Sequence, residues 1–536
     1  MKKIYLSIVA AVSLMFVSCT ADWLNTDPST AVPSDDAIKN IDDAQVALNG
    51  IYRLASAHSY YGDNYLYYAD CRGEDVQARI NKGAGRRVSP YYFFDVTADD
   101  NFNITLVWNQ PYKVIHQANS LIEKLDAGNA GNARPEEVAR IKSEALAMRG
   151  LALFDLTRLF GMPYTLDNGA SLGVPIEIQT TLEDHAPERN TVAQCYEQVL
   201  KDLNDALGGL TKEKHDAYMN YWSVKALLSR VYLYMNDNEN ALKCAEEVIN
   251  DNGGIYRLFT HDEYPSVWGK DFNSESLFEF YFTMSEPSGG SGGEGAPMVY
   301  ADNVKDWNNL ILTKAYLDLL NEDPEDVRHV FPHLPENAVA DTLPVAAKGQ
   351  PKYLIKYPGK SGSVTDAVST VNPQDNDLCI LRLSEVYLNA AEAAFKIGNT
   401  EKALTYLNAI VTRANPAKSV TSADLSLERI LKERRKELVG EGHAFFDYMR
   451  NGKSVDRSGG WHLTMPEDAR VIAPSDPRVA LPIPQTEIDA NPNIVTNLDN
   501  CFVHVKFALL FDDDIGEKGF LFTIYMVQNH ISSVFI

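Results

Sequence analysis

The sequence predicts a mainly α-helical protein in which a tetratricopeptide-like helical-repeat scaffold carries an irregular, loop-rich region. From Ile141 to Leu159, apolar residues recur every three or four positions, which places them on one face of a helix. The segments ALLSRVYLYMNDNENALKCAEEVI, from Ala226, and LNAAEAAFKIGNTEKALTYLNAIV, from Leu388, share one pattern of helix, polar turn and second helix. The loop-rich region is predicted at 252–378, where Gly, Pro and aromatic residues are frequent and no long helical period occurs.

The predicted elements follow one another in a simple order. An N-terminal region, 35–251, begins with a helix near 35–54 and contains an irregular, aromatic-rich segment at 56–107. Helix pairs are expected for 108–125 with 136–160, for 191–207 with 217–235, for 239–251 with a neighbour, and for 381–396 with 400–414. The small residues Ala241 and Ala403 let paired helices approach closely, and such pairs must stack to bury their apolar faces. Unrelated amphipathic helices are the alternative to a true repeat.

The C-terminal region, 379–497, contains the last helix pair and two charged or Pro-rich segments. Arg434 and Arg435 lie between Glu433 and Glu437, which predicts charge pairs along one helix. The segment LPIPQTEIDANPNI, from Leu481, is punctuated by Pro and is expected to run extended over the helices. An atypical tail, 498–536, follows, and it is interpreted either as an added element or as the product of a reading-frame shift.

Composition excludes some classes of protein. The chain has 536 residues, of which 45% are apolar and 23% are charged, as in folded globular proteins. The excess of 73 acidic over 49 basic residues gives a net charge of -24. Because a field of that sign repels polyphosphate, nucleic acid is not expected as a partner.

The N-terminus has the pattern of an export signal. Met1-Lys2-Lys3 precedes an apolar run from Ile4 to Val17, and Ser18-Cys19 follows. This arrangement resembles a bacterial lipobox, so residues 1–18 are predicted to be a lipoprotein signal peptide, Cys19 the lipidated residue and 19–34 a tether. Attached acyl chains would hold the protein at a membrane surface. An ordinary signal peptide with a chance cysteine is the alternative, and no transmembrane helix is expected elsewhere.

Motifs of catalysis lack their structural context. Gly289-x-Ser291-x-Gly293 and Gly290-x-Gly292-x-x-Gly295 match known strings, but both lie in one Gly-rich loop without the strand and helix that the chemistry requires. His329 and His333 have helical spacing, but Pro332 interrupts them and no third ligand is evident. We therefore expect no catalytic residue, no metal site and no cofactor, and the protein is predicted not to be an enzyme. A secreted glycosidase with paired carboxylates is retained as an alternative.

Four segments together identify a family. ADWLNTDPST follows Cys19, SEALAMRGLALFDLTRLFGMPY begins at Ser143, ERRKELVGEGHAFFDYMRNG begins at Glu433, and ALPIPQTEIDANPNI begins at Ala480. The chain resembles the SusD/RagB family of Bacteroidetes surface lipoproteins over about residues 19–497. The resemblance implies a lipid anchor outside the outer membrane, binding of glycans or other nutrients, and a SusC-like TonB-dependent transporter as partner. It implies no catalysis and no essential cofactor.

Candidate ligand residues are chosen from the loops, because a ring must be exposed to stack on a sugar. The first group lies in 58–103 and comprises Tyr60, Tyr61, Tyr65, Arg79, Tyr91, Tyr92 and Asn103. The second lies in 264–308 and comprises Tyr264, Trp268, Tyr300, Trp307 and Asn308. Trp268 and Trp307 are preferred because polar residues flank them, whereas Trp108 is assigned to the scaffold. Core packing is the alternative for every ring.

The predicted function is therefore capture of oligosaccharide by a lipid-anchored protein of the outer membrane, exposed at the cell surface, for delivery to the SusC-like transporter. The alternative is a helical-repeat scaffold that binds a peptide or a protein at the outer membrane.

Overall fold

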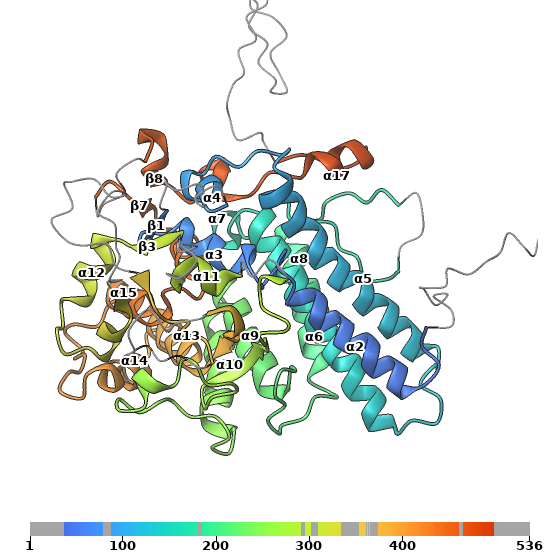
Figure 1. The fold of residues 1–536 in the computed structure, drawn as a ribbon, viewed down its shortest axis with the longest axis horizontal. Helices are drawn as coiled ribbons and strands as arrows, with labels where there is room; N and C mark the ends of the chain where they lie inside the picture. The colour runs from blue at the N-terminus through green and yellow to red at the C-terminus, as the bar shows by residue number, and fades with distance from the viewer. Residues whose placement is uncertain are drawn as a thin grey trace, which may run out of the picture.

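The computed structural model describes residues 37–78, 87–180, 185–290, 295–301, 309–333, 353–360, 362, 364, 373–459, 462 and 465–497 (Figure 1). The predicted signal peptide with Cys19, the tether and the tail 498–536 lie outside the described residues. Most of the described chain is helical, which agrees with the predicted fold class. No helix in these ranges has the length and apolar character needed to cross a bilayer.

The helices have the following bounds: α2 Ile41–Ala55, α3 Asn64–Cys71, α4 Ser89–Phe93, α5 Leu106–Asp126, α6 Pro135–Phe160, α7 Tyr164–Asp167, α8 Val192–Ala206, α9 Tyr221–Tyr234, α10 Asn238–Asp251, α11 Ala296–Ala301, α12 Lys314–Leu320, α13 Leu383–Lys396, α14 Thr400–Ala414, α15 Leu427–Leu438, α16 Ala444–Arg450 and α17 Gln485–Ala490. The strands are β1 Val76–Ala78, β2 Ser276–Phe280, β3 Leu310–Leu312, β4 Pro332–His333, β5 Tyr353–Leu354, β6 Leu378–Arg382, β7 Val455–Asp456 and β8 Val471–Ile472.

The two related sequence segments form the same turn. Asn236 and Gly398 both take a left-handed conformation, with φ of 60° and 80°. The next residue caps the following helix in each case, since Asp237 accepts from the backbone N–H of Asn240 at 3.2 Å and Asn399 accepts from that of Lys402 at 3.1 Å. The repeat in sequence is therefore a repeat of helix, turn and cap.

Packing of the helices corrects one predicted pair. Helices α5 and α6 pair, α13 and α14 pair, and α10 packs between α9 and α13. Figure 1 shows α2, α5 and α6 side by side. The predicted pairing of 191–207 with 217–235 is wrong in its main contact, because α8 lies chiefly against α6, and α9 pairs with α10. Gly150 of α6 permits this approach, since a Cβ there would lie 3.1 Å from the Leu203 side chain of α8.

Short strands tie the loop-rich region to the helices. The described strands form four two-stranded antiparallel sheets, β1–β3, β2–β6, β4–β5 and β7–β8. In the β2–β6 sheet, Phe280 pairs with Leu378 and Ser276 pairs with Arg382, and β6 runs directly into α13. All five residues of β2 are buried, so this strand fixes the loops at its two ends to the helical core.

The charged segment around α15 is largely buried, and its charges pair mainly with distant parts of the chain. One local pair is present, Arg429 with Glu433 at 2.7 Å. The other charges reach across the fold: Arg434 donates to Asp447 at 2.9 Å, and Glu437 accepts from Arg382 at 2.7 Å. Charge pairs along this helix are therefore present only in part among the described residues, because α15 is largely buried and its buried charges have distant partners.

The segment from Leu481 crosses the helices, but it is extended only in part, because Gln485–Ala490 form the helix α17. The backbone N–H of Leu481 donates to the carbonyl of Leu159 at 2.8 Å, and that of Gln485 donates to the carbonyl of Ala98 at 2.8 Å. The segment thus joins the end of α6 to the irregular stretch before α5.

Candidate functional site

Three of the predicted ligand residues, Arg79, Trp307 and Asn308, lie outside the described residues. The structure describes the remaining predicted residues, and most of them are buried, although ligand residues were expected to be exposed.

Tyr91, Tyr92, Asn103 and Tyr300 are buried, so the exposure predicted for them is wrong. Their polar atoms are engaged within the protein. Tyr91 donates to the Asn103 carbonyl at 2.5 Å, the Tyr92 hydroxyl bonds His462 Nδ1 at 2.8 Å, Asn103 donates to Asp100 at 2.9 Å, and Tyr300 donates to Asp70 at 2.7 Å. Core packing, the stated alternative, describes these four side chains.

The other tyrosines are also part of the interior. Tyr60 and Tyr61 each donate to Asp155 Oδ2 at 2.6 Å, and Tyr65 donates to Asp155 Oδ1 at 2.5 Å. Tyr264 is fully buried. None of these rings presents a face to solvent.

Trp268 is half-buried and forms the wall of a small cleft. The Lys356 ammonium lies 4.7 Å from its ring centroid, the Arg382 guanidinium lies 5.3 Å from it, and the Phe331 ring packs edge-on at 5.0 Å. The Lys356 and Arg382 side chains therefore already contact the Trp268 ring. The Trp268 cleft, which Lys270, Asp271, Glu279, Asn376 and Asp377 also line, has a volume of about 40 Å³. It has room for water or a single hydroxyl group and not for a sugar ring.

One aromatic side chain at the mouth of this region is exposed. Tyr281 follows β2 directly and is 48% exposed, and no other aromatic ring of the described residues is exposed to a comparable degree. It stacks on Phe272, with the ring centroids 5.6 Å apart and the planes 16° apart. We call Phe272, Tyr281 and Lys360 the Tyr281 platform.

The backbone holds Phe272 in an unusual conformation. Its φ is 45°, in the left-handed region that non-glycine residues seldom adopt. Glu279 accepts its backbone N–H at 2.5 Å, and Lys214 donates to its carbonyl. Such strain persists where the surroundings enforce it, and it collects at binding sites.

Lys360 fixes the platform from the other side. Its ammonium lies 3.6 Å from the Tyr281 ring centroid and 2.9 Å from both Asp271 and Asp377. Burial, reinforced by the neighbouring Glu279 carboxylate, raises the pKa of Asp377 to about 8. Lys360 lies equally close to the carboxyl groups of Asp271 and Asp377. The platform is rigid, aromatic and bordered by hydrogen-bonding groups.

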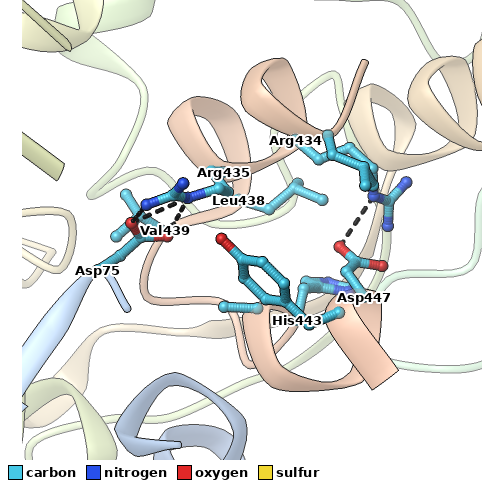
Figure 2. Close-up of a pocket in the computed structure, with 10 residues that line it drawn as sticks. Asp75, Arg434, Arg435, Leu438, Val439, His443 and Asp447 are labelled. Carbon is cyan, nitrogen blue, oxygen red and sulfur yellow. Dashed lines mark hydrogen bonds and ion pairs between the residues drawn. The ribbon is translucent and has the colours of Figure 1, made fainter. Parts of the chain in front are cut away.

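A further cavity, shown in Figure 2, belongs to the scaffold. Its volume of about 20 Å³ suits one water. Arg435 pairs with Asp75 and Arg434 pairs with Asp447 in its wall. Burial lowers the pKa of His443 to about 4, so this imidazole is neutral. No cluster of His, Cys, Asp and Glu suited to a metal ion occurs in the part of the chain that the structure describes.

The stretch predicted from the sequence contains Phe272 and Tyr281, but neither is among the predicted ligand residues. Both lie within the 264–308 group, beside the chosen Trp268 and its neighbours Lys270 and Asp271. In the run FEFYFTM, from Phe278, alternation of apolar and polar residues does not show which side chain is exposed, because every residue of β2 is buried. The position of Tyr281 as the first residue after the strand was the available indication.

Comparisons with known proteins agree with this fold. The family model described as "SusD family" matches residues 348–499, and the one described as "Starch-binding associating with outer membrane" matches residues 22–233. A SusD superfamily protein from Bacteroides thetaiotaomicron VPI-5482 is 57% identical, with a TM-score of 0.81 over 85% of this chain and 99% of that chain. This chain belongs to the SusD superfamily.

Two other solved SusD-type structures are similar. A putative sugar binding protein from Bacteroides vulgatus ATCC 8482 is 36% identical, with a TM-score of 0.76 over 86% of this chain and 99% of that chain. A laminarin-binding SusD-like protein is 25% identical, with a TM-score of 0.66 over 86% of this chain and 99% of that chain. The predicted SusD/RagB resemblance and the helical-repeat fold class are confirmed.

Proposed function

We propose that this SusD-family protein binds carbohydrate and that the Tyr281 platform is its binding surface. The observation that carries the proposal is the exposure of Tyr281, stacked on Phe272 and backed by Lys360. A pyranose ring has an apolar face that fits an aromatic ring, while its hydroxyls need donors and acceptors at the rim. Sugar-binding and laminarin-binding relatives support this class of ligand.

The polar groups around the platform bind the hydroxyls of the sugar, and the aromatic rings stack on its apolar face. Asp271 accepts from hydroxyls, and Lys270 and Lys360 donate to them. The 40 Å³ Trp268 cleft admits a single hydroxyl or its bridging water, so the sugar ring itself lies outside on the platform. No step of this binding requires a bond to break, so the protein acts as a capture protein and not as an enzyme.

The place of action is the outer membrane. Acylation of Cys19 anchors the chain there, and a SusC-like TonB-dependent transporter takes up the captured oligosaccharide. The lipobox-like pattern at residues 1–19 and the family description "associating with outer membrane" support this location. Replacement of Cys19 by Ala should abolish incorporation of an alkyne-labelled fatty acid. Affinity purification of the wild-type protein from its own membranes should recover a TonB-dependent barrel in stoichiometric amount.

The binding test is retention on a panel of neutral polysaccharides, followed by titration with oligosaccharides of the retained one. Tyr281→Ala removes one stacked ring, which is worth about 1 kcal/mol or about fivefold in Kd. Tyr281→Phe keeps the ring and is the matched control, with Kd expected within about twofold of the wild type.

Each outcome decides a separate point. Failure of the wild-type protein to retain any glycan contradicts carbohydrate binding. Equal retention by Tyr281→Ala and the wild type contradicts the platform as the binding surface. Release of shortened oligosaccharides during incubation contradicts passive capture and favours the glycosidase alternative.

A further inference from the structure

A larger cavity lies on the helical part of the protein and shares no residue with the Tyr281 platform. It opens between helix α5, the stretches 175–177 and 185–187, and helix α17. Figure 1 shows α17 beside the end of α5 where that helix begins. Its volume of about 450 Å³ is in the range of small-molecule sites, whereas the Trp268 cleft has about 40 Å³. We call it the α5 groove.

The walls of the α5 groove are held in place by side-chain hydrogen bonds to main-chain carbonyls. Tyr112 donates to Pro175 O at 2.9 Å, Asn119 to Glu177 O at 3.2 Å, Asn491 to Pro187 O at 2.9 Å, and Asn493 to Ala186 O at 2.8 Å. The groove therefore keeps its shape without a ligand, which lowers the entropic cost of binding.

The floor of the α5 groove contains an indole ring, that of Trp108. Trp108 lines the groove and is only 3% exposed, and its ring packs edge-on against Phe160 at 4.8 Å. Its indole N–H is the one polar group that this ring can offer to a ligand. A ligand oxygen in the groove would accept from it.

Hydrogen-bonding groups surround this floor on both sides. Asn109, His116 and Gln117 are exposed along α5 together with Lys113. On the opposite side, His185 bonds Glu177 at 2.9 Å, and Glu487 projects from α17. Amides, imidazoles and carboxylates at the rim, with aromatic side chains below, suit a polyhydroxylated ligand, and the mixed charges favour neither an anion nor a cation.

A peptide fits the same groove less well. An extended peptide binds by main-chain hydrogen bonds to a free backbone edge. Here the stretches 175–177 and 185–187 are not strands, and their carbonyls at Pro175, Glu177, Ala186 and Pro187 each accept from a side chain, so they offer no regular strand edge.

We propose that the α5 groove is a second carbohydrate-binding site, which holds a ligand of about disaccharide size with Trp108 donating to one of its oxygens. The proposal rests on the proposed carbohydrate-binding function and adds a site that is independent of the Tyr281 platform. A polysaccharide can then be held at two points of one chain, which increases its retention without tighter binding at either point.

The test uses full-length protein labelled with 5-fluorotryptophan and fluorine NMR, because Trp108 lines one site and Trp268 borders the other. Assignment comes from Trp108→Phe and Trp268→Phe. The probe is the shortest oligosaccharide that binds in the panel experiment. We expect the Trp108 signal to shift saturably in the wild type and equally in Tyr281→Ala. The triple variant Asn109→Ala/His116→Ala/Gln117→Ala should lose this shift or raise its Kd at least tenfold, while the Trp268 response is retained.

The control is Glu197→Ala, an exposed substitution on α8 outside both sites, which should leave both responses unchanged. The substituted groove residues are exposed on α5, so unchanged circular dichroism is expected for the triple variant. The second site is overturned if glycan binds and Trp108 does not respond, or if Tyr281→Ala abolishes both responses. If no glycan binds at all, carbohydrate binding itself has failed, and that result is distinct from either of these.

Discussion

The Asp155 carboxylate in α6 organises a buried cluster whose energetics can be tested. Tyr60 and Tyr61 donate to its Oδ2 at 2.6 Å each, and Tyr65 and Arg158 donate to its Oδ1 at 2.5 and 2.6 Å. Asp155→Asn keeps one oxygen for Tyr65 and Arg158. It replaces the other oxygen with an NH₂ group, which cannot accept from Tyr60 or Tyr61.

The expected cost follows from these four bonds. Each hydroxyl left without its acceptor costs about 1–3 kcal/mol, and Arg158 loses its buried counter-charge. We therefore expect Asp155→Asn to lower the free energy of unfolding by about 3–5 kcal/mol, a large part of the ~5–15 kcal/mol typical of a domain. In the wild type, the double substitution Tyr60→Phe/Tyr61→Phe should also lower the free energy of unfolding, because two hydrogen bonds to a charged acceptor are lost. In the Asp155→Asn background the same pair of substitutions should be nearly neutral, because it removes the two unpaired hydroxyls.

The assay is equilibrium unfolding in guanidinium chloride, followed by circular dichroism, on the four proteins of this double-mutant cycle. We expect a coupling energy of about 1–3 kcal/mol at unchanged m value. Tyr67→Phe is the control, because Tyr67 is buried in α3 together with Tyr65 but donates to Asn64 at 3.1 Å. A Tyr60/Tyr61 cost that is the same in both backgrounds would refute the role assigned to Asp155.

Three further predictions concern the scaffold. Glu437→Gln should lower the free energy of unfolding by about 3–5 kcal/mol, measured by chemical denaturation. The substitution removes one negative charge that Arg382 and other buried cations pair with. A loss of less than about 1 kcal/mol would contradict this. Burial raises the pKa of Asp70 to about 7, so its contribution to stability is complete below about pH 4 and is lost as the pH rises through about 7. Asp70→Asn should therefore become more stable relative to the wild type across that range, and a constant difference between the two would oppose the argument. Gly442→Ala should lower the melting temperature, since φ is 75° and the added Cβ would lie 2.8 Å from the Leu66 carbonyl oxygen; an unchanged melting temperature would count against this strain.

The candidate site could be predicted from the sequence only in outline. The stretch 264–308 is predicted because exposed rings are expected in loops, and Tyr281 with Phe272 lies within it. Trp268 was preferred over both, although its ring faces are used by Lys356 and Arg382. Those two cations come from segments about ninety and more than a hundred residues further along the chain, and no local pattern around Trp268 indicates them.

The assignment of Trp108 to the scaffold, made because it begins a predicted helix, is confirmed by the burial of its ring. The structure adds that the α5 groove lies above it. The groove forms where the stretches 175–177 and 185–187 and helix α17 pack around α5. The apolar periodicity of α5 predicts a helix but does not indicate which distant segments lie beside it.

The sequence by itself determined the helices, the repeated turn at Asn236-Asp237 and Gly398-Asn399, and the family, because these depend on neighbouring residues and on motifs that keep their order. Only the tertiary structure decided which aromatic rings are buried. Tyr91 and Tyr281 are the same kind of side chain in similarly aromatic surroundings, yet one is fully buried and the other is 48% exposed. Exposure depends on all the segments that pack around a ring, and most of these are remote from it in the sequence.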